Sequence, residues 1–576
     1  MEQVFFDRAI EEIKSGRVKR AEINRFKNIL AKESKIKRIP TDIEILMRAK
    51  KEDLAQLKKH LLVKKTRTIS GVSPVAVMTE PSFCPHGKCT MCPGGPGSVF
   101  GDVPMSYTGH EPATMRGMRA GFDSYLQIFN RLEQYIMLGH NVDKVELIIM
   151  GGTFPATSKE YQENFVLGCF KAMNDFSELF FKNNEIDIEK FKEFFELPHD
   201  KRDKEVSERI KQKIRLVKGN STLEIEQKRN ENAKVRCIGM TIETKPDWGL
   251  LKHGNEMLRL GCTRVELGVQ TLHDDVLKKI NRGHTLQETK DSIRELKDLG
   301  FKLNFHFMLG LPLMDREKDI EAIKELFENA DYRPDMLKIY PCMVSPGTVL
   351  FNQMKRNEYQ PITTDEAADR ISEGIRYVQR YCRIMRVQRD IPPKFMAAGV
   401  DRSNLRQYVD ELAEKKGIKC NCIRCREIGR FDSKPNLGKA EMGPAEQVQL
   451  GDEVIFNILE YEASNGREFF ISADTKRQDA IVGFVRLRYP SQLLRPEITE
   501  KSALIRELHV YGNATEVGEE GESQHKGVGK KLLEMAERQA KKDGKDKIVI
   551  ISGVGVRAYY EKLGYKLEGP YMVKNI

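Results

Sequence analysis

Three cysteines fall within nine residues of this sequence, in a stretch rich in glycine and proline. Cys84, Cys89 and Cys92 form the pattern C-x4-C-x2-C. The neighbouring Gly and Pro residues predict a loop, which can fold three short side chains back onto one point. Three thiolates can hold a [4Fe–4S] cluster and leave one iron free for a small molecule. A zinc site closed by His86, or by a ligand elsewhere, is the alternative that this spacing also allows.

A second group of cysteines ends a basic stretch of the chain. Cys420, Cys422 and Cys425 fall within six residues, which is typical of a structural metal knuckle, and zinc is the expected ion. We expect Cys342, at the end of a predicted strand, to be the fourth ligand and to tie this stretch to the preceding domain. Cys382 is the second choice. A chance cluster of unliganded thiols is the remaining alternative.

A glycine-rich segment near the C-terminus could bind phosphate. Gln524, Gly527 and Gly529 form the pattern Q-x-x-G-x-G, between a predicted strand and a predicted helix. The free backbone N–H groups and the positive dipole of a helix start suit a pyrophosphate. Because a short Gly-x-Gly pattern is common, its position after a strand is the more informative observation.

The elements that must position the first cysteine loop are six apolar runs, most of them followed by helical stretches. Continuous apolar runs alternating with helices predict parallel strands covered by helices, whose ligands gather at the carboxyl ends of the strands. Candidate ligands follow the strands at those ends, including the cysteine loop, a Gly-Gly-Thr turn and Glu243. The predicted strands are Val75–Thr79, Val145–Phe154, Val235–Thr244, Arg264–Thr271, Lys302–Pro312 and Met336–Cys342.

The rest of the chain divides by composition into further units. The pattern of residues 1–70 predicts a basic helical region. Residues 71–395 contain the predicted parallel sheet, with a charged helical insertion at about 156–233. Residues 396–450 form a basic linker with the second cysteine group. Residues 451–576 predict a separate α/β domain, in which Asn465-Gly466 is a hairpin turn.

Charge and hydropathy bound the function. Residues 1–70 hold 19 Lys and Arg against 10 Asp and Glu, and residues 380–426 hold 12 against 5. Two basic regions on a chain of net charge +11 favour a polyanionic partner such as nucleic acid, although a solvated helix face is an even alternative for either region alone. No apolar run is long enough to span a membrane, and the 11 cysteines form no disulfide framework, so we expect a cytoplasmic protein.

The cysteine triad followed by Gly151-Gly152 after the second strand resembles the radical SAM superfamily, although the usual first gap is one residue shorter. The segment at 524–529 resembles the GNAT acetyltransferase signature. Together they resemble one family, the catalytic third subunit of Elongator in its stand-alone prokaryotic form, whose longer first gap this chain shares. Segments that carry this resemblance are 75–78, 84–96, 106–109, 150–154, 507–512 and 552–555, with Tyr559-Tyr560.

The resemblance implies a fold and an activity. The fold is α/β, a radical SAM partial (βα)6 barrel plus a C-terminal GNAT domain and a small N-terminal helical domain. The activity is a radical, acyltransferase-type carboxymethylation of the wobble uridine at C5. The implied cofactors are a [4Fe–4S] cluster, S-adenosylmethionine (SAM), acetyl-CoA and Zn²⁺, and the partners are the anticodon stem-loop of tRNA and an external electron donor. A homodimer is compatible with the sequence.

By the same resemblance, site residues are expected at both cofactors. Tyr559 or Tyr560 would position the thioester or assist its hydrolysis. Lys144 and His509 are the further catalytic candidates, and Lys144 would contact acetyl-CoA from the barrel side, unless it is simply a surface lysine. Residues expected to bind SAM are Gly151, Gly152, Thr153, Glu243 and Gln270; those expected around acetyl-CoA are Glu507, Leu508, His509, Val510, Gln524, Lys526, Gly527, Val528 and Gly529.

Two other functions compete with this interpretation. A lysine acetyltransferase acting on proteins would use the iron–sulfur domain as a structural part and would need a carboxylate base, for which Glu507 is the only obvious candidate. A non-catalytic module that senses acetyl-CoA and binds tRNA would need no radical apparatus. The presence of three functional constellations on one chain argues against the second alternative.

Overall fold

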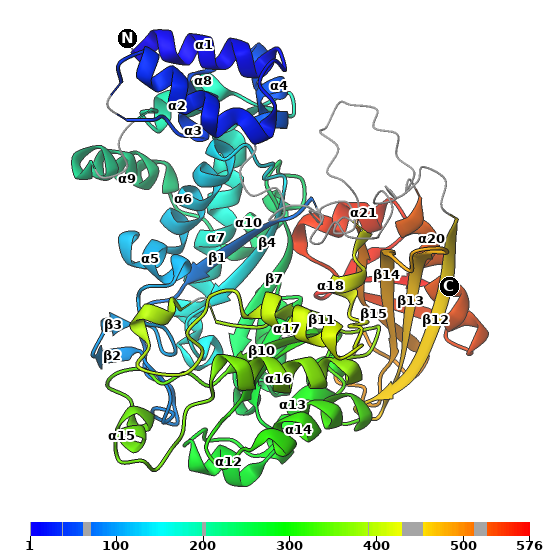
Figure 1. The fold of residues 1–576 in the computed structure, drawn as a ribbon. Coiled ribbons are helices and arrows are strands. Elements are labelled where there is room, and N and C mark those ends of the chain that lie inside the picture. The colour runs from blue at the N-terminus through cyan, green and yellow to red at the C-terminus, as the bar shows by residue number, and fades with distance from the viewer. Residues whose placement is uncertain are drawn as a thin grey trace.

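The computed structural model describes residues 2–36, 38–61, 71–198, 203–389, 391–428, 453–511 and 527–576. Two seven-stranded sheets dominate it, and a helical bundle at the N-terminus lies at one end of the molecule (Figure 1). None of the helices in the described ranges combines the length and the hydrophobicity needed to cross a bilayer.

The first sheet is parallel throughout, in the order β1-β4-β7-β8-β9-β10-β11. All six predicted strands are present. The seventh, β11, was not predicted because its four residues Arg-Ile-Met-Arg carry no apolar run. The strands are β1 (Ser73–Met78), β4 (Lys144–Met150), β7 (Arg236–Thr244), β8 (Arg264–Gln270), β9 (Lys302–Leu309), β10 (Met336–Pro341) and β11 (Arg383–Arg386).

Helices cover the outer face of this sheet, and the two faces differ in burial. Val145, Leu147 and Ile149 of β4 are fully buried, whereas Glu146 and Ile148 between them are only half-buried. Alternate residues of a strand point to opposite faces, so the inner face of this part of the curled sheet is partly accessible. The helices of this domain are α5 (Pro112–Arg119), α6 (Ser124–Met137), α7 (Lys159–Phe180), α11 (Leu251–Arg259), α12 (Asp274–Lys279), α13 (Leu286–Asp298), α14 (Arg316–Glu328), α15 (Val349–Lys355), α16 (Thr364–Gly374), α17 (Leu405–Lys415) and α18 (Ile423–Arg426).

The expected insertion at 156–233 is only partly peripheral. Its first helix, α7, is the crossover between β4 and β7, and Phe165, Phe170 and Phe176 on it are buried in the main core. The sequence suggested an insertion because the crossover is unusually long. Its other elements are the hairpin β5 (Phe181–Lys182) and β6 (Glu185–Ile186), and the helices α8 (Ile188–Phe194), α9 (Lys204–Lys218) and α10 (Leu223–Asn230).

The N-terminal region is helical, as predicted. Thr41 caps α3 through a capping box with Glu44. Helix α3 ends at Arg48, and α4 begins as a separate helix at Lys51. The helices are α1 (Glu2–Lys14), α2 (Ile23–Glu33), α3 (Asp42–Arg48) and α4 (Lys51–Leu61).

The second sheet has the order β12-β13-β14-β15-β16-β18-β17 and is antiparallel except where β15 pairs with β16. Helix α20 packs on one face of it, and the other face lies against the first domain. The elements are β12 (Val454–Ala463), β13 (Gly466–Thr475), β14 (Ile481–Tyr489), β15 (Ser502–Val510), α20 (Val528–Lys542), β16 (Lys547–Ile551), α21 (Arg557–Glu561), β17 (Lys566–Glu568) and β18 (Tyr571–Asn575); a small hairpin, β2 (Gly95–Ser98) and β3 (Gly101–Val103), follows the first cysteine loop.

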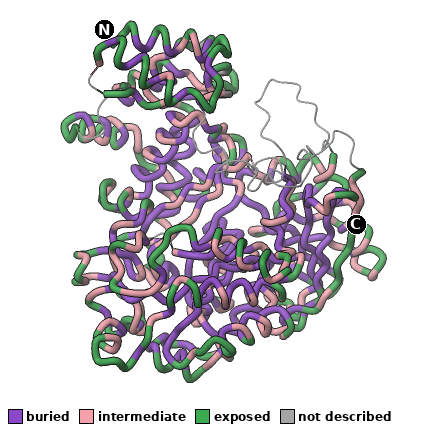
Figure 2. Tube along the Cα trace, viewed as in Figure 1, coloured by how far each residue is buried: buried purple, intermediate pink, exposed green. Residues whose placement is uncertain are grey.

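A buried ionic network joins the two sheets. Arg506 of β15 donates to both carboxylate oxygens of Asp335, at 2.7 and 2.6 Å, and Asp335 immediately precedes β10. Arg488 of β14 donates to Asp298 at 2.7 Å, just before β9. All four side chains are essentially inaccessible to solvent. Figure 2 shows that buried residues fill the interior of the molecule. The C-terminal domain therefore caps the amino ends of the barrel strands, opposite the cysteine loop at their carboxyl ends.

Candidate functional site

The first cysteine loop suits a cluster better than a single ion. Cys89 and Cys92 are buried against Met105, with Cys84 beside them. The sulfur atoms of the triad do not all lie within 4.8 Å of one another. Around one zinc ion, with Zn–S of about 2.3 Å, sulfur atoms lie no more than about 4.6 Å apart. Because a [4Fe–4S] cluster spreads its ligands over different iron atoms, the triad fits such a cluster.

The Gly-Gly-Thr turn meets the cysteine loop. The sulfur of Cys84 lies 3.6 Å from the hydroxyl of Thr153, and a Cβ built on Gly152 would lie 3.9 Å from that sulfur. Gly151 has φ of +134°, and a Cβ there would lie 2.0 Å from the Thr79 hydroxyl. The turn thus requires glycine and leaves bare backbone facing the cluster site.

Cationic side chains that the sequence analysis missed surround Cys89. Arg282 donates to its sulfur at 3.7 Å, and His86 Nε2 lies 3.3 Å from it. Lys245 Nζ lies 3.0 Å from His86 Nδ1, which leaves this histidine held between a lysine and a thiol. Burial, together with Lys245 and Arg282, lowers the pKa of His86 to about 4. Positive charge beside a thiolate favours an electron-rich cluster.

Glu243 lies inside the barrel, beside the Gly-Gly-Thr turn. Tyr107 donates to it at 2.9 Å, and the backbone N–H of Gly151 also supports the carboxylate. Burial and the nearby Glu266 raise the pKa of Glu243 to about 7. Gln270 ends β8 with φ of +69°, a conformation that turns the chain at the same edge. These positions place Glu243 and Gln270 at the same end of the sheet as the cysteine loop.

Glu266 is the centre of a second buried polar group. It accepts from His306 at 2.9 Å, from Asn304 at 3.0 Å and from the ammonium of Lys338. Glu243, Glu266 and His306 converge closely enough to hold a metal ion. Because Lys338 already supplies the cation in this group, the geometry favours a polar network rather than a metal site.

The second cysteine group has the compact geometry of a single-ion site. The sulfur atoms of Cys420, Cys422 and Cys425 lie within 4.8 Å of one another, and Arg406 donates to Cys425 at 3.2 Å. These three thiolates fit three of the ligand positions around a zinc ion.

The preferred fourth ligand, Cys342, is not part of this group. It is buried in a separate apolar cluster with Val344 and Tyr359, because its side chain turns into the packing below the carboxyl end of β10. Cys382 is closer to the site, since its carbonyl accepts from the backbone N–H of Ile423 at 2.9 Å. The choice of Cys342 was therefore wrong. The sulfur of Cys382 lies outside the group of three as well, because it is not within 4.8 Å of all of them.

The C-terminal domain forms an opening between β15 and β16. The two strands pair only as far as Ile505 and Ile550, so the backbone of the next five residues of β15 has no partner on the β16 side. Leu508, His509 and Val510 lie in this segment and are half-exposed. Glu507 precedes them and accepts from Arg486 at 2.9 Å. Despite its burial, Lys302 and Arg486 lower the pKa of Glu507.

The start of α20 lies beside this opening. Gly527 caps the helix with φ of +95°, Val528 begins it, and a Cβ on Gly529 would lie 3.6 Å from the Tyr559 hydroxyl. The predicted residues Gln524 and Lys526 lie outside the described residues. The bare helix start fits a pyrophosphate, as the sequence predicts.

The two tyrosines of α21 have different surroundings. Tyr559 is 40% exposed and faces Gly529, whereas Tyr560 is 6% exposed and packs against Tyr565. Burial raises the pKa of both hydroxyls, so the hydroxyl of Tyr559 stays protonated at neutral pH. Only Tyr559 is placed to reach a ligand held by Gly529.

Lys144 lies at the boundary between the domains. It is the exposed first residue of β4 and pairs in register with Arg236 of β7. A Cβ on Gly555 would lie 2.6 Å from the Arg236 Cβ, and Gly555 lies two residues before the helix of Tyr559. Lys144 thus lies at the end of the barrel that faces the C-terminal domain.

The sequence matches models of three protein families. They are the radical SAM superfamily over residues 81–327, the radical SAM C-terminal domain over 334–415 and the acetyltransferase (GNAT) family over 439–565. The chain is 44% identical over 576 residues to tRNA uridine(34) acetyltransferase of Methanocaldococcus jannaschii, covering 99% of this chain and 96% of that protein. It is 37% identical over 577 residues to Elongator complex protein 3 of Saccharomyces cerevisiae, covering 98% and 94%.

The chain belongs to the Elongator complex protein 3 family. A solved structure of the archaeal Methanocaldococcus infernus Elp3, with residues 1–46 deleted, aligns with a TM-score of 0.69 at 38% identity, covering 88% of this chain and all of that one. The predicted α/β fold, a radical SAM partial barrel followed by a GNAT domain, is confirmed for this member of the family.

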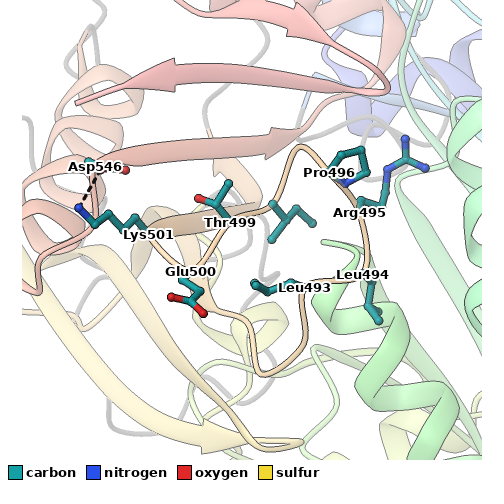
Figure 3. Close-up of a pocket in the computed structure, with 9 residues that line it drawn as sticks. Leu493, Leu494, Arg495, Pro496, Thr499, Glu500, Lys501 and Asp546 are labelled. Carbon is teal, nitrogen blue, oxygen red and sulfur yellow. Dashed lines mark ion pairs between the residues drawn. The ribbon is translucent and has the colours of Figure 1, made fainter.

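Two cavities in the described part of the chain differ in the residues that line them. One, of about 740 Å³, lies between the loop at 493–501 and Asp546, and none of the predicted site residues lines it (Figure 3). A smaller one of about 430 Å³ adjoins Gly527 and is lined by Phe456, Lys530, Lys531 and Arg538. Three basic side chains and Glu534 therefore line a cavity beside the bare start of α20.

Proposed function

We propose that this protein modifies the wobble uridine of tRNA, adding an acetyl-derived group at C5 that ends as a carboxymethyl group. The observation that carries the proposal is the combination of two sites in one molecule. A thiol triad too widely spaced for a single ion faces a bare Gly-Gly turn at the carboxyl end of the barrel, and the C-terminal domain, which caps the amino end, carries a bare helix start suited to a phosphate. The names of the relatives give the substrate class, the uridine at position 34 of tRNA.

The residues present fit the cofactors that the family implies. Cys84, Cys89 and Cys92 would hold a [4Fe–4S] cluster, with SAM bound by Gly151, Gly152, Thr153, Glu243 and Gln270. When bound, these groups would supply a carbon-centred radical that takes hydrogen from the acetyl methyl of acetyl-CoA, giving a radical able to add to C5 of uracil. Loss of one electron, to the oxidised iron–sulfur cluster, and of the C5 proton would restore the C5–C6 double bond, and hydrolysis of the thioester would release CoA and leave the carboxymethyl group. C5 is a poor nucleophile, which makes radical addition a sensible route.

The C-terminal domain would present the acetyl group. The backbone N–H groups from Gly527 to Gly529 would bind the pyrophosphate, and the unpaired backbone at 507–510 would hold the pantetheine. The Tyr559 hydroxyl, protonated at neutral pH, would donate to the thioester carbonyl and steady the negative charge that develops there during hydrolysis. Glu507 is poorly suited to be the base of a lysine acetyltransferase, because Arg486 stabilises its ionised form.

The basic regions would bind the phosphate backbone of tRNA. The N-terminal helices and the segment 380–426 carry much of the positive charge, and phosphate contacts position RNA without reading its sequence. Selectivity would then come from the unstacked bases of the anticodon loop. Reduction of the cluster requires an external electron donor.

The test is product analysis under anaerobic conditions. The reconstituted protein is incubated with dithionite, SAM, acetyl-CoA and bulk tRNA, and the nucleosides are analysed by mass spectrometry. We expect 5-carboxymethyluridine from the wild type and from Cys169→Ala, a buried thiol remote from the triad, but none from Cys89→Ala. Acetylated protein without modified uridine would support the lysine acetyltransferase instead.

A further inference from the structure

A row of polar side chains crosses the inner face of the barrel sheet. Glu243 of β7 pairs in register with Glu266 of β8, and Glu266 pairs with Asn304 of β9. His306 lies two residues after Asn304, on the same face, and pairs with Lys338 of β10. The side chain of His306 is 18% exposed, whereas that of Glu266 is 2% exposed. Solvent therefore reaches this row of the barrel interior at the histidine ring.

Glu266 fixes the orientation and the tautomer of the His306 ring. Burial raises the pKa of Glu266, but Lys338 and the hydrogen bond from His306 outweigh burial and hold this pKa well below its usual range. Because an ionised carboxylate can only accept, the Nε2 atom of His306, 2.9 Å away, carries the proton. The Nδ1 atom then keeps its lone pair. A carboxylate that orients an imidazole in this way is typical of histidines that act as bases.

The Nδ1 atom of His306 is available to a substrate. It has no hydrogen-bond partner among the described residues, and it is not one of the polar atoms closed off from solvent. Burial and Lys338 lower the pKa of the ring to about 4, so the imidazole is neutral at neutral pH. In the described part of this row, the proposed function assigns Glu243 to SAM, and Glu266 and Lys338 pair with each other. His306 is therefore the available base.

The histidine ring lies beside the expected radical site. Facing atoms of Glu243, Glu266 and His306 all lie within 4.8 Å of one another. The backbone N–H of Gly151, in the turn that faces the cysteine loop, supports the carboxylate of Glu243. His306 is thus next to the carboxylate that would bind SAM.

We propose that His306 is the base that removes the C5 proton of the target uridine after the acetyl-derived radical has added. The addition forms a carbon–carbon bond at C5 and leaves the unpaired electron at C6. When that electron passes to the oxidised iron–sulfur cluster, the two electrons of the C5–H bond close the C5–C6 double bond, and the proton moves to Nδ1 and then to solvent. The carboxylate of Glu266 stabilises the imidazolium that forms.

A weakly basic imidazole is sufficient for this step. The adduct that has lost an electron is a cation, and loss of its C5 proton restores the conjugated ring, so it is a strong acid. This inference rests on the proposed function, and it names the group that accepts the proton which that reaction must release.

The first test follows single turnovers with tRNA transcribed with or without deuterium at C5 of uridine. The reconstituted protein receives dithionite, SAM and acetyl-CoA, and mass spectrometry quantifies both 5′-deoxyadenosine and modified uridine. His306→Gln keeps a side-chain N–H for Glu266 but has no basic nitrogen. We expect this variant to form 5′-deoxyadenosine within about twofold of the wild-type rate, but modified uridine at least ~10-fold more slowly and with a larger deuterium isotope effect. His253→Gln, at a half-buried position on α11, is the control and should match the wild type.

The second test needs neither tRNA nor a reduced cluster. Long-range ¹H–¹⁵N spectra of the oxidised, cluster-loaded protein labelled with ¹⁵N-histidine report which ring nitrogen is protonated, and the signals missing from His306→Gln identify the ring. We expect a neutral ring with its proton on Nε2 and none on Nδ1. A proton on Nδ1 would rule out the assigned role.

The products of the single turnovers separate this inference from the proposed function. Loss of modified uridine with 5′-deoxyadenosine retained in His306→Gln supports the assignment. Wild-type modification by this variant would overturn it, and so would an equal loss of both products, because the histidine would then act on SAM. A wild-type protein that forms no modified uridine would contradict the proposed function itself.

Discussion

At the scale of single residues, the two tyrosines of α21 separate a chemical role from a packing role. Tyr559 faces Gly529, whereas Tyr560 is packed against Tyr565. We expect Tyr559→Phe to slow tRNA-dependent release of CoA from acetyl-CoA at least ~10-fold, because a positioned proton donor contributes at least that much. Tyr560→Phe should lower the melting temperature rather than the rate. Equal rates for wild type and Tyr559→Phe would exclude the role assigned to this hydroxyl.

Glu243 should make SAM binding depend on pH. Burial and Glu266 raise its pKa to about 7, so the free carboxyl is largely protonated below pH 7. If the carboxylate accepts hydrogen bonds from SAM hydroxyls, binding releases a proton, and affinity should fall about tenfold for each pH unit below 7. Calorimetry from pH 5.5 to 8 measures this slope. Glu243→Gln should bind more weakly with a flat profile, and an unchanged slope in this variant would assign the titration to another group.

Residue types and spacing predict the ligands of this site but not their surroundings. The triad, the Gly-Gly-Thr turn and the Q-x-x-G-x-G segment are readable because each is contiguous in sequence. Arg282 and Lys245 were not predicted, since nothing local marks residues that reach Cys89 and His86 from distant loops. Cys342 was misassigned for the same reason, because its position in the sequence does not reveal in which part of the fold its side chain packs.

At the scale of elements, the turn after β4 depends on a glycine backbone. We expect Gly151→Ala to weaken SAM binding at least ~10-fold, because φ of +134° and contact with Thr79 at 2.0 Å force the turn to move. Gly544→Ala is the matched control. It also has a positive φ, of +77°, but no atom lies within 4 Å, so only a backbone cost of about 1–2 kcal/mol is expected. Similar SAM affinities in the two variants would show that the turn is not part of the site.

Strands were predictable where they are apolar and continuous. The six barrel strands have buried hydrophobic runs, but β11 is short and polar, and it is fixed by pairing with β10 rather than by its own sequence. Helix α7 was taken for part of an insertion because crossover length alone does not reveal which segment packs on the sheet. Its buried phenylalanines were the available signal.

At the scale of the whole molecule, buried charges hold the two domains together. Arg506→Met leaves Asp335 and Glu468 without their shared partner, and breaking such buried pairs typically costs about 3–5 kcal/mol. We expect a corresponding loss in the free energy of unfolding measured with urea. Arg8→Met removes an exposed pair with Glu33 and should cost no more than about 0.5 kcal/mol. Comparable losses in both variants would contradict a special role for the interface network.

In the proposed function, one molecule uses both of its sites on the same acetyl group. The most direct measurement is deuterium transfer from acetyl-CoA labelled in its methyl group to 5′-deoxyadenosine, with reconstituted protein, dithionite, SAM and tRNA, read by mass spectrometry. We expect deuterated 5′-deoxyadenosine to form together with modified uridine, and neither to form with Cys89→Ala. Modified uridine accompanied only by unlabelled 5′-deoxyadenosine would contradict the account, because the acetyl methyl would then not be the source of the hydrogen.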